Sequence, residues 1–410
     1  LITANHKDYN SFYSQLGFNG SPAEGQPLIF TISAEVQASS SILRALRIDV
    51  GIGESSLTGK LDYSFSDVRP RLSGLFDATF IDGDVLMPAD KTLRLKRDTE
   101  RGGVTSAGTI SRRWSNDPID LSLLTEFDSD IQITADRLQI RGIEIDEFTG
   151  RVTLQDGILS LKDWRGHLYG GLSRADFILK VGSVLEIESE LIITNAVLQR
   201  LLERQSESIS AEGRLAMIGS FNASGSNQQE IITSLTGEGK FSVTGIDAGA
   251  GEQVLGLGLV MAPLRALSQL DGVFSGGVTE GLASFGAEFY GRDGIFSFSN
   301  ATLDSNVYSG VFSGNVNLPS WLIDASGRVI LEVNLTTQIL GSRLQMPNLI
   351  PIKVQGPLDL PDVTISSGLS VQTEQTRDSA KALRQERDPS LLRTPGQLFQ
   401  SIVKEFNKTN

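Results

Sequence analysis

The sequence predicts a mostly β protein: a long antiparallel meander of short strands, with a few short helices and a C-terminal amphipathic helix. Three observations predict this fold class. Apolar and polar residues alternate over short runs along most of the 410 residues, which is the period of half-buried strands. Asp-Gly pairs, which favour tight turns between antiparallel neighbours, separate several runs. Few segments space their apolar residues as helices do. We therefore expect a sheet with one apolar and one polar face.

The alternating runs place apolar side chains on one face of each expected strand. In the run 130–134 the two isoleucines share a face, and in 137–141 Leu138 and Ile140 do the same. The same pattern recurs in 151–155, 185–188 and 328–335. The turns expected beside these runs and farther along the chain are Arg141-Gly142, Gln155-Asp156-Gly157 and Arg292-Asp293-Gly294.

Two segments of the chain resemble each other, which suggests a repeated sheet unit. The turn and strand that begin at Asp156 recur at Asp293, as DGILS and DGIFS. A Tyr-x-Gly sequence follows in each copy, at Tyr169 and at Tyr308, and another strand-like run comes after it. The matched order of turn, strand, Tyr-x-Gly and strand favours a repeat over coincidence.

Three segments have helical spacing. Thr194 and Asn195 can cap a helix whose apolar face includes Val197, Leu198, Leu201 and Leu202. The stretch 254–270 predicts a helix interrupted by a proline. The last helix has Thr394 as its cap and Pro395 in its first turn, after a polar linker at 373–389. Its apolar face comprises Leu398, Phe399, Ile402, Val403 and Phe406.

The composition excludes several kinds of chemistry. The chain has no cysteine, so it has no thiol nucleophile, disulfide or cysteine-bound metal, and its two histidines leave little material for histidine-based catalysis. A net charge of −13 disfavours nucleic acid as a partner. We therefore expect a protein that is not an enzyme and has no cofactor or metal. The absence of cysteine also suits an oxidising compartment.

Other candidate sites have simpler explanations. His167 fits a strand-edge histidine better than a catalytic base. Glu144, Asp146 and Glu147 resemble a glycosidase pair, but a solvated strand face explains them better. The glycines at 249–251 lack the Lys-Ser/Thr pair of a phosphate loop.

Several landmarks resemble one protein family. Residues 113–124, RWSNDPIDLSLL, resemble the W-S-x-[DE]-P-[IL]-D-L segment of the AsmA-like proteins of Gram-negative envelopes. The stretch 210–239 resembles the characteristic C-terminal region of that family, and so does the ending 351–363. The resemblance covers roughly Leu57 to Ile365, with the landmarks in the family's order.

This resemblance implies a bridge-like lipid-transfer protein whose meander curls into an elongated, taco-like apolar groove. It implies a periplasmic location, with the chain anchored to the inner membrane by an upstream helix that is absent from this sequence, which starts at Leu1. It also implies phospholipids as ligands, with the inner membrane and, as a further candidate, the outer membrane as partners. The expected organisation is an N-terminal part of the groove at 1–112, an AsmA-like region with the repeat at 113–372, and the linker with the helix at 373–410.

Because every second residue of a strand lies on the same face, the alternation identifies candidates for lipid-facing residues. An ordinary sandwich core would give the same alternation, but the few expected helices cannot cover so long an apolar face, and with the resemblance we favour a lipid-facing interior. The candidates are Ile131, Ile133, Leu138, Ile140, Ile143, Ile145, Val152, Leu154, Leu159, Leu161, Phe177, Leu179, Leu185, Ile187, Phe241, Val243, Phe296, Phe298, Val329, Leu331 and Val333.

The resemblance, taken together with this pattern, implies one function, and a second from another class stays open. The first is periplasmic phospholipid binding and transfer that contributes to outer-membrane lipid homeostasis. The rival is a scaffold or assembly factor for outer-membrane proteins, in which protein side chains would occupy the apolar face. For the C-terminal helix, docking on the sheet or at the end of the groove is favoured over a membrane surface, because the tail carries little positive charge.

Overall fold

The computed structural model confirms a mostly β chain with few short helices and a C-terminal helix. The structure describes residues 2–6, 29–65, 69–83, 113–140, 143–203, 213–247, 282–305, 308–331, 349–358, 361–365 and 394–408. The expected helix at 254–270, the linker at 373–389 and Val333 lie outside the described residues.

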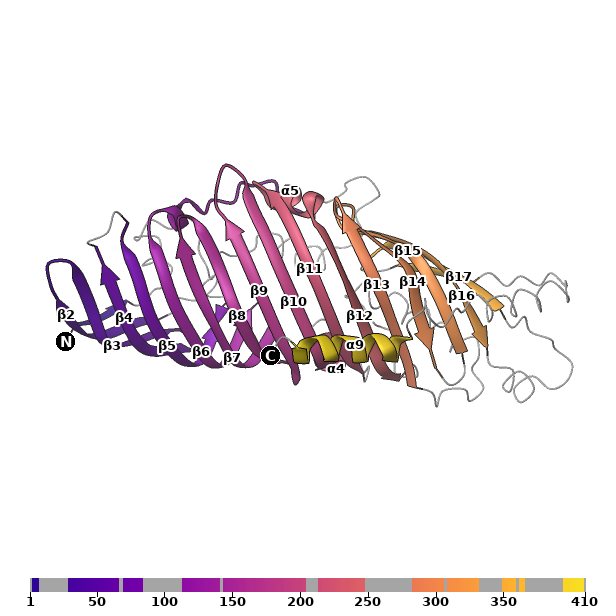
Figure 1. The fold of residues 1–410 in the computed structure, drawn as a ribbon, viewed down its shortest axis with the longest axis horizontal. Helices are drawn as coiled ribbons and strands as arrows, with labels where there is room; N and C mark the ends of the chain where they lie inside the picture. Colours follow the sequence, from indigo (N-terminus) through magenta and orange to yellow (C-terminus); the bar gives the residue numbers. More distant parts are fainter. Residues whose placement is uncertain are drawn as a thin grey trace, which may run out of the picture. The chain divides into compact units, whose positions relative to one another are not determined.

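The chain divides into two compact units. The first comprises Leu1–Leu168, Ser173–Ser189 and Asn222–Ile232, and the second comprises Tyr169–Leu172, Glu190–Phe221 and Thr233–Asn410. Strands form each unit, as Figure 1 shows. Tight turns form where the Asp-Gly pairs predict them: Asp156, Gly157, Asp293 and Gly294 all have φ between 51° and 75°.

The first unit is an open, curled sheet in which neighbouring strands follow the chain. Antiparallel pairs join β1 to β5 in order, and then β6 to β8. The strands are β1 (Ile2–His6), β2 (Phe30–Ala38), β3 (Ile42–Ile52), β4 (Ser55–Ser64), β5 (Arg71–Asp82), β6 (Asp128–Ile140), β7 (Ile143–Gln155), β8 (Ile158–Leu168) and β9 (Gly171–Lys180, of which Gly171 and Leu172 lie in the second unit). Strand β10 (Leu185–Val197) begins in this unit and ends in the second.

The pair of β5 and β6 departs from the expected antiparallel meander. These strands run parallel, with Phe76 opposite Ile133 and Ala78 opposite Ala135. A parallel pair cannot be closed by a hairpin turn, so the chain after β5 must return to the end of the sheet where β5 began. Alternation reports the faces of a strand and not its direction, which is why the sequence did not predict this crossover.

The last part of the crossover, residues 113–127, is here called the strap. One end of the strap bonds to the short helix α5 (Gln228–Ser234): the Gln229 N–H donates to the Ser115 carbonyl, and the Ser115 N–H donates to Gln228 Oε1, both at 3.0 Å. Its other end contains the 3₁₀ turn η1 (Ser122–Thr125) and leads into β6. The strap includes the tryptophan segment of the sequence pattern, so that segment has a structural role here.

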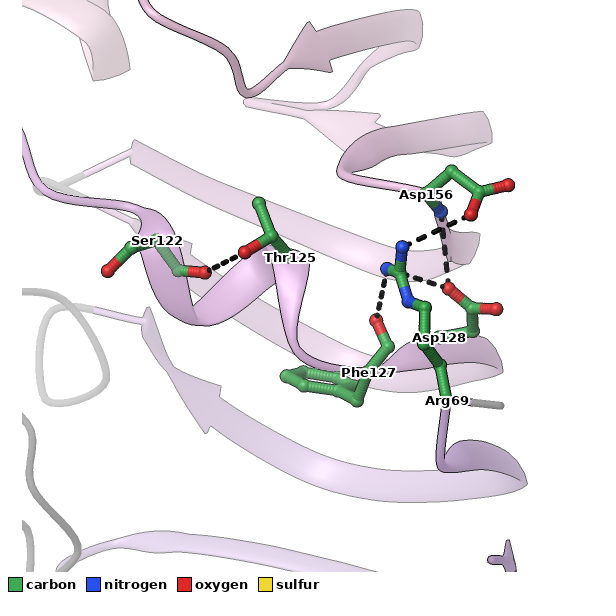
Figure 2. Close-up of polar contacts among 6 residues, drawn as sticks. All are labelled: Arg69, Ser122, Thr125, Phe127, Asp128 and Asp156. Atoms are coloured by element: carbon green, nitrogen blue, oxygen red, sulfur yellow. Dashed lines mark hydrogen bonds and ion pairs between the residues drawn. The ribbon is translucent and has the colours of Figure 1, made fainter. Parts of the chain in front are cut away.

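Arg69, just before β5, fixes the start of β6 (Figure 2). Its guanidinium lies 3.0 Å from Asp128 Oδ1 and 3.1 Å from Asp156 Oδ1, and it donates a longer hydrogen bond to the carbonyl of Phe127. The Asp156 N–H donates to the same Asp128 oxygen. One partly buried arginine therefore joins the entry to β5, the entry to β6 and the β7–β8 turn.

Replacing Arg69 with alanine is expected to destabilise the protein by about 2 kcal/mol, because hydrogen bonds to a charged group are lost and Asp128 keeps a partly buried charge. Arg71→Ala is the matched control, since Arg71 is 55% exposed and lies 3.7 Å from its carboxylate partner. Chemical denaturation of both variants measures the difference. Equal losses would contradict the role of Arg69.

The strands are longer than the alternating runs predict. Most have 9 to 13 residues, whereas the runs have four to eight. The reason is that the alternation changes phase within strands. In β3 the buried residues Ala45 and Ile48 are three positions apart, and the pairing with β4 is irregular between them. A β-bulge restores both side chains to one face and bends the strand.

The helices agree in part with the prediction. Helix α4 (Leu198–Glu203) forms, but Thr194, Asn195 and Val197 belong to β10 and do not cap or join it. Helix α5 was not predicted, although Asn227 and Glu230 form a capping box: the Glu230 N–H donates to Asn227 Oδ1 at 2.9 Å. Hydrogen bonds from the Ser226 N–H and the Asn227 amide lower the pKa of Glu230.

The second unit is a further open antiparallel sheet with a helix on one face. Neighbours in the chain pair from β12 to β18. Its strands are β11 (Arg214–Gly225, of which Asn222–Gly225 lie in the first unit), β12 (Thr236–Asp247), β13 (Leu282–Arg292), β14 (Ile295–Asp304), β15 (Tyr308–Asn317), β16 (Leu322–Leu331), β17 (Leu349–Pro357) and β18 (Asp362–Ile365).

Helix α9 (Pro395–Lys408) lies against β12, β13 and β14 (Figure 1). As predicted, Thr394 caps it: the Gln397 N–H donates to Thr394 Oγ1, and the Thr394 N–H donates in return to Gln397 Oε1. The Ser242 hydroxyl donates to the Pro395 carbonyl at 2.7 Å, and Lys240 pairs with Glu405 at 2.9 Å. Among the described residues, no helix has the length and apolar character needed to cross a membrane.

Candidate apolar binding face

Strand pairing in the first unit aligns apolar side chains across seven strands. Residues directly opposite each other in a sheet lie on the same face, so the register defines rows that cross the strands. One row consists of Ala34, Ile48, Gly59, Phe76, Ile133 and Gly150, with Trp164 of β8 packed beside it. A second row consists of Val36, Ala45, Leu61, Gly74, Ile131, Val152 and Leu161. We call the face that carries these rows the inner face.

The inner face carries both odd-numbered and even-numbered candidates from the same strand, which strict alternation would place on opposite faces. Leu138 lies opposite Ile145, and Ile140 lies opposite Ile143. Leu154 pairs with Ser129 and with Leu159 in the neighbouring strands. Leu138, Ile140 and Ile145 pack in one cluster with Ile133, which is possible because the phase changes between Ala135 and Leu138 in β6 and between Ile145 and Phe148 in β7.

Most of the inner face is only partly covered. Leu138 and Leu154 are buried, and Ile143 at the end of its strand is 43% exposed. Large side chains on strands as far apart as β2 and β8 keep part of their surface accessible. These partly buried members are Ile32, Val36, Val50, Leu57, Leu61, Phe76, Ile131, Ile133, Ile140, Ile145, Val152, Leu159, Leu161 and Trp164.

The candidates on β9 and β10 follow the same alternation. Lys180 pairs with Glu188 at 2.6 Å and with Glu186 at 3.6 Å, so these charges share one face. Strand geometry puts the intervening residues on the other face. Of the latter, Leu179 and Leu185 are buried, and Phe177 and Ile187 are partly buried. The two carboxylates raise the pKa of Lys180, Glu188 most strongly.

The opposite, outer face of the first unit is polar and charged. Asp62 pairs with Arg44 at 3.1 Å, and Arg137 lies 3.5 Å from Asp146. Asp130 accepts two hydrogen bonds from Arg151 at 2.7 Å, which lower its pKa. The first unit therefore has one mainly apolar face and one mainly polar face.

The Asp130–Arg151 pair is expected to stabilise the fold in a pH-dependent way. The folded state lowers the pKa of Asp130, so its contribution is present above the unfolded value of about 4 and is lost as pH falls through the lower folded value. Thermal unfolding should show Asp130→Asn less stable than the wild type at pH 7, with the difference shrinking as pH falls below about 4 and vanishing below the folded pKa of Asp130. In an Arg151→Leu background the substitution should have little effect at any pH. A pH-independent difference would contradict this assignment.

The other candidates for chemistry lie on the outer face. Asp146 is directly opposite His167, and His167 Nδ1 lies 3.5 Å from Glu147 Oε2 at the surface. Glu144 is opposite Gln139. Within the described part of the chain, no group of three potential ligands is placed to hold a metal ion. The glycines at 249–251 lie outside the described residues.

The apolar face of the second unit is filled by its own aromatic side chains. Phe241 and Phe285 lie with ring centroids 5.8 Å apart, and Phe289 contacts Phe296 at 5.9 Å. All four are at least 93% buried. We call this surface the aromatic face. The candidates Val243, Phe298 and Val329 are also buried on it, and the side chain of Leu331 is not described.

Helix α9 lies on the face opposite the aromatic face. Lys240 and Ser242 alternate along β12 with Phe241 and Val243, so they point the other way, toward α9. Leu398, Ile402 and Phe406 are buried, while Phe399 and Val403 are partly buried. The helix therefore docks on the sheet, as favoured from the sequence, but not over its aromatic face.

Sequence reasoning missed the inner-face residues of β2 to β5 and the pair of Gly150 and Trp164. The run Phe30–Val36 has a clean alternation that could have identified β2. The glycines carry no such signal, because their place in the rows depends on which strands are neighbours.

Comparison with known proteins supports the sequence resemblance. A model of the AsmA family matches residues 31–250, more than half of the chain, including the strap and the whole of the 210–239 stretch but not 351–363. No curated protein and no solved structure matches the chain. The chain therefore belongs to the AsmA family, which is associated with the bacterial envelope.

Proposed function

We propose that this protein binds phospholipids in the periplasm, with acyl chains on the inner face of its first unit, and that it moves lipid as part of outer-membrane lipid homeostasis. Its partners are phospholipids and the inner membrane, with the outer membrane as the destination or source. The proposed activity is binding and transfer without bond chemistry.

One observation carries the proposal: the inner face is apolar in continuous cross-strand rows and yet remains partly exposed. An apolar surface of this extent requires a covering ligand or partner. Acyl chains suit it because their attraction is non-directional, at about 0.8 kcal/mol for each buried methylene. A chain can therefore shift between equivalent positions along the rows without breaking specific bonds.

The distribution of charge supports lipid over protein as the occupant. Asp62, Asp130 and Arg151 lie on the outer face, and the register places no charged side chain in the two inner rows. A protein partner would commonly bring hydrogen-bonding groups that need polar counterparts. Acyl chains need none, and their head groups can stay in water beyond the strand ends.

The test is mass spectrometry of lipids that co-purify with the chain after extraction without strong detergent. The proposal predicts stoichiometric phospholipid, with more than one molecule per chain. Recovery of a folded, lipid-free protein that also takes up no phospholipid from vesicles would overturn it. That result would favour the scaffold function, in which protein segments cover the inner face.

A further inference from the structure

We propose that Gly150 and Trp164 form an acyl-chain contact site on the inner face, with the indole as the surface on which the chain lies. This inference rests on the proposed lipid function and assigns it to a particular place. Its basis is the combination of a glycine in mid-strand, an aromatic ring directly over it and an indole N–H without a partner.

Gly150 leaves room for the indole ring. A Cβ atom at this position would lie 2.6 Å from Trp164 Cδ1 and 2.8 Å from Trp164 Nε1, closer than real Cβ contacts allow. Gly150 does not have a positive φ, so the backbone itself would accept alanine. Glycine within a strand costs roughly 0.5–1 kcal/mol relative to alanine. Glycine at position 150 therefore makes room for the indole ring at the cost of some stability of the strand.

Trp164 is held in a defined orientation. Its ring meets Phe148 edge to face, with centroids 5.1 Å apart and planes at 84°. Ile133 lies directly opposite Gly150 on the neighbouring strand, so the indole and Ile133 flank the glycine. Trp164 and Ile133 both pack against the cluster of Ile81 and Phe148, yet both remain partly exposed.

The indole nitrogen is the second sign of function. Trp164 Nε1 is buried and has no hydrogen-bond partner among the described residues. Buried indole N–H groups usually find an acceptor, and an unsatisfied one is costly. Two departures from local stability at one place are typical of functional sites. A flat, rigid, apolar surface that is partly open is suited to a methylene chain.

The second unit also has a glycine beneath an aromatic ring, but there the ring is buried. A Cβ on Gly291 would lie 2.3 Å from Phe296 Cε1, so this glycine also makes room for a ring. Phe296 is only 6% exposed and contacts Phe289 and Phe221. This pair belongs to the filled aromatic face, and it therefore serves as a matched control.

The test uses phospholipid vesicles whose acyl chains carry bromine at mid-chain, which quenches tryptophan on contact. The site predicts that part of the fluorescence of the wild type is quenched and that this part is absent in Trp164→Phe. A phospholipid with a nitroxide on its head group should quench this part much less. Equal quenching of the wild type and Trp164→Phe by mid-chain bromine, with lipid bound to both, would overturn the site and leave the proposed function standing.

Substitution of the glycines tests the geometry. Gly150→Ala should displace the indole and weaken phospholipid binding about tenfold, whereas Gly291→Ala should bind as the wild type does. Trp164→Leu, which removes the ring without crowding Gly150, should weaken binding similarly and covers the case in which Gly150→Ala does not fold. Unchanged binding by Trp164→Leu would contradict the site. If the wild type itself binds no phospholipid, the proposed function fails first and the site fails with it.

Discussion

Replacing Leu61 and Ile133 together with aspartate is expected to abolish phospholipid retention. Both residues are partly exposed members of the inner rows, on β4 and β6. A carboxylate there would have to lose water against an acyl chain, at a cost of several kcal/mol for each group. Since about 1.4 kcal/mol corresponds to a tenfold change in affinity, binding should fall at least about a hundredfold.

The matched control places the same substitutions on the other face. Leu75 and Ile158 are 55% and 43% exposed, and by register Leu75 lies beside Lys60 and Gln132 on the outer face. Leu75→Asp with Ile158→Asp should keep its bound lipid. Lipid mass spectrometry on both double variants, with circular dichroism to verify β structure, measures the contrast. Equal retention by two folded variants would show that lipid does not occupy the inner face.

Replacing Ile402 with alanine is expected to cost about 2–5 kcal/mol and to release helix α9. Ile402 is fully buried between Leu398 and Phe406 on the docked side of the helix. A free helix of 14 residues is marginal in water, so loss of docking should also melt it. Limited proteolysis should then cut within 395–408 much faster than in the wild type.

Gln400→Ala is the control for α9, because Gln400 is exposed on the same helix. It should leave both the protease resistance and the thermal unfolding unchanged. If Ile402→Ala instead left the stability unchanged and reduced binding of the protein to vesicles, the docking prediction would be wrong. That result would support the alternative in which α9 lies at a membrane surface. The buried hydrogen bond from Ser242 to Pro395 favours docking.

The sequence predicted the fold class and the nature of the candidate face because both depend on local alternation. Ile131 and Ile133, or Leu138 and Ile140, are placed on a common face by strand geometry alone. The family resemblance depends on landmarks such as the tryptophan segment, which are also local. The C-terminal helix was predicted correctly for the same reason, since Thr394 and Pro395 define its start.

What the sequence could not supply are relations between distant strands. Whether Ile133 and Leu138 share a face depends on the phase change between them, which no single residue marks. The parallel pairing of Phe76 with Ile133 depends on the path of the crossover. The filling of the aromatic face by Phe241 and Phe285, in contrast to the partly open inner face, depends on packing that alternation does not record.

The strap also has a consequence for the order in which the chain can fold during synthesis. Ser115 bonds to Gln228 across a separation of 113 residues, and Ile119 bonds to Ser226. A ribosome releases these partners only after β6 to β10 have emerged. A nascent chain that ends before Gln228 therefore cannot form these hydrogen bonds, so the strap can be fixed only after most of the first unit has been synthesised.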